Sequence, residues 1–146
     1  MLFSGWAFFI AAIKAAARAS PQVLVRAASQ SASVEWESDR PPSSLTEPII
    51  MEVLGGARDE DGEAHLRRLL LRFELLQFDP VADFDGAVRI YRSCRRAGVT
   101  PRGMVDCLVA SVARRRAATL LSHDVDFERM ARVVGIDLDE TSSPST

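Results

Sequence analysis

Residues 119–138, TLLSHDVDFERMARVVGIDL, decide the fold class, because two apolar runs flank a segment of helical character. Residues 119–122 predict a strand, residues 126–134 a short helix and residues 136–138 a last strand. A strand, a helix and a second strand in succession are typical of a parallel sheet with helices packed on it. The stretch therefore predicts an α/β protein.

The same alternation continues toward the N-terminus. Thr46 is a good N-cap, Pro48 suits a first turn and Gly55 ends the segment, so a helix is predicted over 47–54. Further helices are predicted where apolar residues recur at helical spacing. These stripes are Leu66, Leu69, Leu70 and Phe73, then Phe84, Ala87, Val88, Tyr91 and Cys94, then the segment 103–116, with a strand predicted over 75–78.

Composition places the chain among single globular domains. It has 146 residues, of which 47% are hydrophobic and 26% charged, and its net charge is −2. These proportions exclude a disordered or collagen-like chain, and the net charge supplies no bulk attraction to nucleic acid. Two cysteines without a CxxC pair, and two histidines, exclude a zinc ribbon and a thioredoxin-type motif. A reducing cytoplasm is the expected location.

Both ends of the chain differ from its middle. Residues 2–13 form an apolar run that is too short to cross a bilayer, and no basic segment precedes it as in a signal peptide. We expect a helix over 5–19 there, with a membrane location as a weaker alternative. The predicted organisation is an atypical N-terminal helix and linker over 1–44, a domain over 45–138 and a disordered tail over 139–146.

Asp106 is the charged residue that most demands an explanation. Between Gly103 and Ala113 it is the one charged side chain, in a segment that is apolar nearly all round and so predicts a buried helix. A buried carboxylate is costly unless it is paired, protonated or bound to a cation. A functional carboxylate is favoured over the bland alternative, a salt bridge to Arg95 or Arg96.

Two further acids, Asp124 and Asp126, follow the strand predicted over 119–122, together with Ser122 and His123. Open α/β sheets place their active sites at the carboxyl ends of parallel strands. One of the two acids is also expected to cap the helix that follows.

Glu52 sits at the edge of the apolar face of the first helix, where a solvated carboxylate is the bland alternative. Glu52, Asp106, Asp124 and Asp126 together offer oxygen ligands that suit Mg²⁺ or Mn²⁺ rather than zinc. Phosphodiester hydrolysis by a metal-activated water is the natural chemistry of such a set.

Four segments carry a resemblance to a known family: TEPIIMEVLGGA at 46–57, YRSCRRAGVT at 91–100, VDCLVA at 105–110 and HDVDF at 123–127. In this order they resemble the VapC toxins, which are PIN-domain ribonucleases of bacterial type II toxin–antitoxin modules. The resemblance covers about residues 45–138. It implies a three-layer α/β/α PIN fold, Mg²⁺-dependent (or Mn²⁺-dependent) cleavage of tRNA or ribosomal RNA, a VapB antitoxin as partner and a homodimer.

The resemblance also implies roles for individual residues. Asp106 matches the aspartate of the family's (I/V)DCL(I/V)A helix, a principal metal ligand. Glu52 matches the glutamate after the proline-containing segment, and Asp124 matches the aspartate after the last core strand. Asp126 is the further acid of the DxDF signature. Glu52, Asp106 and Asp124 are therefore the expected catalytic residues, with Asp126 as a fourth metal ligand.

The N-terminus departs from the family pattern. VapC chains open with a strand ending in Asp-Thr-Ser-x-Trp, whose aspartate is another metal ligand, whereas here no acid precedes Glu35. Either Ser4-Gly5-Trp6 is the counterpart of this motif, or roughly the first 40 residues have none. Loss of one carboxylate leads us to expect weakened or absent nuclease activity. The alternative function is an inactive VapC-like protein that only binds an antitoxin.

Contacts to RNA phosphates are expected from arginines near the acids, above all Arg95, Arg96 and Arg102. Arg92 and the run Arg114 to Arg116 are weaker candidates, since the run also suits the end of a helix dipole.

Overall fold

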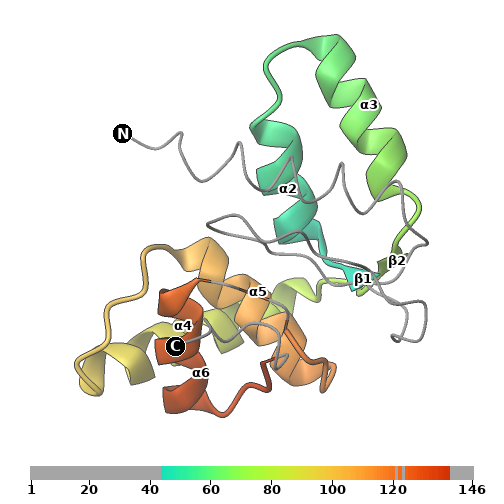
Figure 1. Cartoon of the computed structure of the whole chain (residues 1–146). Helices are drawn as coiled ribbons and strands as arrows, with labels where there is room; N and C mark the ends of the chain where they lie inside the picture. Colours follow the sequence, from blue (N-terminus) through green and yellow to red (C-terminus); the bar gives the residue numbers. More distant parts are fainter. Residues whose placement is uncertain (1–43, 121, 123, 139–146) are drawn as a thin grey trace.

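The computed structural model describes residues 44–120, 122 and 124–138 (Figure 1). The helix expected over 5–19, most of the linker and the tail over 139–146 lie outside these residues. The described elements are β1 (Ser44–Leu45), α2 (Glu47–Gly55), α3 (Glu60–Leu70), β2 (Glu74–Leu75), α4 (Pro80–Arg96), α5 (Met104–Arg115) and α6 (Val125–Val134). Helices α2 and α3 pack side by side, while α4 packs against both α5 and α6, and α5 also contacts α2.

The predicted helices over 47–54, 103–116 and 126–134 are confirmed, with ends that shift by one residue. In α3, Leu66, Leu69 and Leu70 are buried as the stripe predicts, but Phe73 lies beyond the helix and is partly buried. Asp59 begins α3 by accepting a hydrogen bond from the backbone N–H of Gly62 at 2.7 Å. Satisfying an otherwise unpaired N–H in this way stabilises the start of the helix.

The predicted apolar stripe of α4 is partly wrong. Phe84 and Val88 are exposed, and the buried positions are Asp83, Ala87, Ile90 and Cys94. This set also repeats at intervals of three and four residues, but it begins with a charged side chain. Apolar periodicity missed it because α5 covers this face and supplies polar partners for Asp83. Phe84 instead meets Phe78 edge to face, with ring centroids 5.2 Å apart.

The strand expected over 75–78 is shorter in the structure than predicted. β1 and β2 pair in parallel, with Ser44 opposite Glu74 and Leu45 opposite Leu75. The strand expected over 75–78 thus overlaps β2 in one residue, Leu75. Ser44, the last residue of the segment expected as a linker, belongs to β1. Between the strands expected over 119–122 and 136–138, the described residues show a parallel bridge that pairs Leu120 with Leu138. The parallel direction is as predicted.

The core is built around α5, whose residues 109–113 are all buried. Val109 and Ala110 join Ile90 and Cys94 of α4 and Phe127 of α6 in one apolar cluster. Cys94 and Cys107 are both free thiols inside it. Burial raises the pKa of the Cys107 thiol to about 12, with smaller contributions from Cys94 and Asp106. Within the described ranges, every helix is too short or too polar to cross a bilayer.

Candidate functional site

Asp124 and Asp126 lie together at the N-terminal end of α6. Asp124 is the N-cap residue, and its Oδ1 accepts a hydrogen bond from the backbone N–H of Asp126 at 2.9 Å. The Asp124 N–H in turn donates to the hydroxyl of Ser122 at 3.1 Å. The expectation that one acid caps this helix is confirmed. Carboxylates at a helix N-terminus are also stabilised by the helix dipole.

Arg102, in the loop between α4 and α5, reaches both carboxylates. Its Nε lies 2.5 Å from Oδ2 of Asp126, and its Nη1 lies 3.8 Å from Oδ2 of Asp124. Arg129 approaches the other oxygen of Asp126, with Nη1 3.5 Å from Oδ1. Two carboxylates are therefore accompanied by two guanidinium groups, and these four side chains together have no net charge.

Asp106 stands in the first turn of α5 and is 5% exposed, so the predicted burial of this carboxylate is confirmed. The side chains of Arg95 and Arg96 make polar contacts with Thr100 and Ser93 at the end of α4. Glu52 lies on α2, half-buried, beside the fully buried Val53.

Among the described residues, no three histidine, cysteine, aspartate or glutamate side chains lie close enough together to hold a metal ion. The predicted ligands Glu52, Asp106, Asp124 and Asp126 all belong to the described residues, so they do not fit a divalent ion in this arrangement. The carboxylates of Asp124 and Asp126 do come together, but an arginine occupies the position between them. The ligand set stays a prediction.

A second charged cluster, which the sequence did not reveal, joins α4 to α5. The Asp83 carboxylate is 0% exposed and accepts hydrogen bonds from Arg115 Nε at 3.0 Å, Arg115 Nη2 at 2.7 Å and the Ser111 hydroxyl at 3.2 Å. Arg115 also donates to the carbonyl of Gln77. Arg115 is therefore an internal partner of Asp83 rather than a candidate RNA contact or a solvated end of a helix.

Hydrogen bonds set the protonation state of this cluster. Burial alone raises the pKa of Asp83, but bonds from Arg115, the Asp79 N–H and Ser111, with the charge of Arg115, together hold the pKa below its ordinary value. Arg115 has a raised pKa, chiefly because it donates to Asp83. Both groups are charged at neutral pH. One signal in the sequence could have indicated Asp83: it lies in the first turn of the helix that Asp79 and Pro80 begin.

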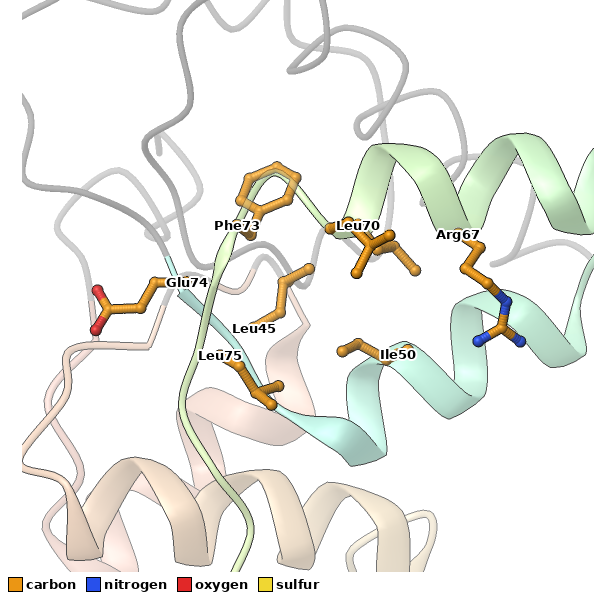
Figure 2. A pocket seen from close by; sticks show the side chains of 8 residues that line it. Leu45, Ile50, Arg67, Leu70, Phe73, Glu74 and Leu75 are labelled. Carbon is orange, nitrogen blue, oxygen red and sulfur yellow. The ribbon is translucent and has the colours of Figure 1, made fainter.

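A separate apolar pocket of about 210 Å³ lies between the β1–β2 pair and helices α2 and α3 (Figure 2). Its wall is mainly aliphatic and aromatic, and Arg67 and Glu74 are its charged lining residues. None of the residues that line it comes from α4, α5 or α6, so the pocket is not part of the acid cluster at α6. Its lining residues are Leu45, Ile50, Arg67, Leu70, Leu71, Phe73, Glu74 and Leu75.

Comparison with known proteins identifies the family. Residues 22–133 match the PIN domain family. The chain is 41% identical over 93 residues to VapC ribonuclease Mb1587 of Mycobacterium bovis and to Ribonuclease VapC11 of Mycobacterium tuberculosis, over 64% of this chain and 69% of each relative. The chain belongs to the VapC group of PIN-domain proteins. Within the range that matches the PIN domain family, no acid precedes Glu35, as the sequence of this stretch shows.

Solved VapBC structures share the fold. The crystal structure of DNA-bound VapBC from Salmonella typhimurium has a TM-score of 0.57 at 24% identity and covers 67% of this chain and 74% of that chain. VapBC2 from Rickettsia felis, bound to a promoter fragment, gives 0.55 at 21% identity and covers 66% and 73%. At these identities the likeness establishes the PIN fold, and the expected α/β architecture of a VapC chain is confirmed.

Proposed function

We propose that this chain is an endoribonuclease toxin of a VapBC module, with tRNA or ribosomal RNA as substrate and a VapB-type antitoxin as partner. The observation that carries the proposal is the 41% identity to proteins named as VapC ribonucleases. The buried Asp106 and the acids at the start of α6 support it, because carboxylates are the residue type on which metal-dependent phosphodiester hydrolysis relies. The antitoxin partner is supported by a fold neighbour from Salmonella typhimurium, which was crystallised as a VapBC complex.

Mg²⁺ or Mn²⁺ is the proposed cofactor, and it would supply an activated water and neutralise charge on the phosphate. The described residues do not fit this ion as they stand, because Arg102 occupies the space between Asp124 and Asp126. No step of the reaction is therefore assigned to it. What these residues do is bring two carboxylates and two guanidinium groups together at the N-terminal end of α6, with no net charge among the four side chains.

Arg95 and Arg96 are the proposed RNA-contacting residues of this chain, together with Arg102. Arg95 and Arg96 stand exposed in the last turn of α4, next to the loop that carries Arg102. Arginine forks suit phosphate oxygens, and each contact that replaces a counterion makes binding weaker at higher salt.

Cleavage of a total tRNA pool in Mg²⁺ tests the proposal. Asp106→Asn is the informative variant, since it removes one charge from a buried acid while it keeps the shape of the side chain. The matched control is Asp85→Asn, which removes an exposed acid that pairs with Arg89 on α4. We expect measurable cleavage by the wild type and the control, and loss of cleavage in Asp106→Asn. Equal cleavage by all three proteins would contradict the assignment.

A second function is favoured by the neutralised acids at α6. A VapC-like protein whose carboxylates are satisfied by arginines can keep its antitoxin-binding surface without cleaving RNA. Co-expression with a VapB-type antitoxin separates the two functions. Stable co-purification without any cleavage by the free chain identifies the binder, and cleavage that the antitoxin suppresses identifies the toxin.

We also propose a homodimer. The outward face of α4 exposes Val81, Phe84 and Val88 along one stripe, and exposed apolar stripes of this kind favour association. Light scattering on the wild type and on Phe84→Glu tests this: the mass should fall from two chains to one. A monomeric wild type would contradict it.

A further inference from the structure

We infer that Arg102 is the resident counter-ion of Asp124 and Asp126, and that it competes with any divalent cation for their carboxylates. This inference rests on the proposed nuclease function, because that function requires a cation at these acids. It concerns the state of the protein before a cation binds. The metal fit fails in this structure at the position that Arg102 fills, and the contacts around Arg102 give the reason.

The geometry makes Arg102 a bridge. Its guanidinium contacts Oδ2 of both acids, through Nε to Asp126 and Nη1 to Asp124. Oδ1 of Asp124 already caps α6 and Oδ1 of Asp126 faces Arg129, so Oδ2 is the oxygen of each carboxylate that Arg102 contacts. A divalent cation placed between the same two oxygens would repel the Arg102 guanidinium, and the two cations therefore compete for them.

The position of Arg102 is held by the loop rather than by its own long side chain. Pro101, immediately before it, is buried, and the Val99 N–H donates to the Cys94 carbonyl at 2.8 Å, which ties the loop to the end of α4. Gly98 makes this turn with a φ of +76°, a conformation that favours glycine. The loop that carries Arg102 is thus tied to the end of α4, and from it the Arg102 side chain reaches the two acids at the start of α6.

The Arg102 side chain is far more exposed than the two carboxylates that it contacts. The Arg102 side chain is 70% exposed, whereas Asp124 and Asp126 are 6% and 13% exposed. An exposed guanidinium can leave for water at little cost, but its departure removes a cation from two poorly solvated carboxylates, and only Asp126 keeps a contact with Arg129 among the ion pairs described above. Replacement of the Arg102 guanidinium by another cation is therefore favoured over breaking the ion pair with no replacement. A hard divalent ion suits the exchange, since it prefers carboxylate oxygens.

Titration with Mn²⁺ alone, followed by calorimetry on the full chain, tests this inference. We expect Arg102→Gln to bind Mn²⁺ about fivefold more tightly than the wild type, the factor expected when an exposed ion pair no longer competes. Arg102→Lys keeps the charge but loses the two-pronged contact, so its affinity should lie between these two. The matched control is Arg89→Gln, which removes an arginine of similar exposure that pairs with Asp85 on α4 and should leave Mn²⁺ binding unchanged.

Nuclear magnetic resonance gives a direct readout in the wild type. The Arg102 Nε–H signal, assigned by its loss in Arg102→Lys, should shift toward that of a free arginine when Mg²⁺ is added. Circular dichroism checks that each variant is folded before it is titrated. Equal Mn²⁺ affinity in the wild type and Arg102→Gln, or an Arg102 signal that Mg²⁺ does not move, would overturn the inference.

The two proposals fail in different ways. If the wild type cleaves tRNA but Arg102→Gln gains no Mn²⁺ affinity, the nuclease stands and the competition is wrong. If Arg102→Gln gains affinity but neither protein cleaves RNA, the competition stands and the nuclease proposal is wrong.

Discussion

Arg115 donates two hydrogen bonds to Asp83 across the contact between α5 and α4, from Nε to Oδ1 at 3.0 Å and from Nη2 to Oδ2 at 2.7 Å. The same Nη2 donates to the Gln77 carbonyl, and the Asp79 N–H donates to Asp83, so the segment before α4 is tied to the end of α5. The contact between α4 and α5 is the most extensive one between two described elements, and this ion pair joins the two helices across it.

Removing one partner of this pair should destabilise the fold strongly. Arg115→Gln leaves the fully buried Asp83 charge without its guanidinium, and losses of this kind cost about 3 kcal/mol. Urea unfolding of Arg115→Gln measures the change, with Arg89→Gln as the control because its ion pair with Asp85 is exposed. The control should stay within about 0.5 kcal/mol of the wild type. Equal stability of the two variants would show that the pair contributes nothing.

Acid should weaken the protein through the same carboxylate. The pKa of Asp83 is lower in the folded chain than in the unfolded chain, because the bonds from Arg115 and its neighbours outweigh burial. The unfolded state therefore takes up the proton first as the pH falls. The stabilisation is fully present above about pH 4, the ordinary range of aspartate, and is lost as the pH falls through the folded pKa. The unfolding free energy between about pH 7 and pH 3 should fall more steeply in the wild type than in Asp83→Asn.

The cysteines should be inert in the native protein. Burial raises the pKa of Cys94, and burial, Cys94 and Asp106 raise that of Cys107 to about 12, so neither is a thiolate near pH 8. The thiolate is the reactive form of cysteine, and both sulfurs lie inside the core. Labelling with a disulfide reagent should modify neither thiol in the folded chain and both in denaturant. Rapid labelling of the native chain would contradict the burial of α4 against α5.

The helices could be predicted from the sequence because their signals are local. Thr46 and Pro48 mark the start of α2, and the leucine stripe of α3 needs no knowledge of its partner. Asp83 could not be predicted, because apolar periodicity assigns an acid to the solvent, and its burial depends on Arg115, 32 residues later. The strand over 75–78 was overestimated for a related reason: pairing depends on a distant neighbour, and β1 meets β2 over two residues.

The candidate site shows the same division. The burial of Asp106 and the capping of α6 by one of its two acids follow from their own helices and were predicted, and the structure shows that the capping acid is Asp124. The sequence predicts Arg102 as an RNA contact, which stays a prediction, but it did not indicate the contacts that the Arg102 guanidinium makes with the two acids. The spacing of residues along the chain indicates which acids are candidates for a site. Whether an arginine lies against these acids depends on the loop between α4 and α5, which carries Arg102 and is distant from α6 in the sequence.

Gly86 should tolerate no side chain, because a Cβ on this residue of α4 would meet Ser111 of α5. A Cβ on Gly86 would lie 2.1 Å from the Ser111 hydroxyl oxygen and 3.3 Å from its Cβ. The serine cannot turn away freely, since its hydroxyl donates to Asp83 at 3.2 Å. Gly86→Ala should therefore lower the unfolding free energy by about 1–3 kcal/mol, the usual cost of overpacking a core.

The variant Ser111→Ala, combined with Gly86→Ala, tests whether the Ser111 hydroxyl causes the predicted loss of stability. It removes the clashing oxygen, so the double variant should be more stable than the sum of the two single losses predicts, by about 1 kcal/mol in a double-mutant cycle. Gly62→Ala serves as the control, because Gly62 is a helical glycine of α3 whose nearest neighbour is the side chain of its own cap residue, Asp59, at 3.0 Å. Strict additivity between Gly86→Ala and Ser111→Ala would mean that the two helices separate to admit the methyl group, and that the α4–α5 contact is looser than the distances indicate.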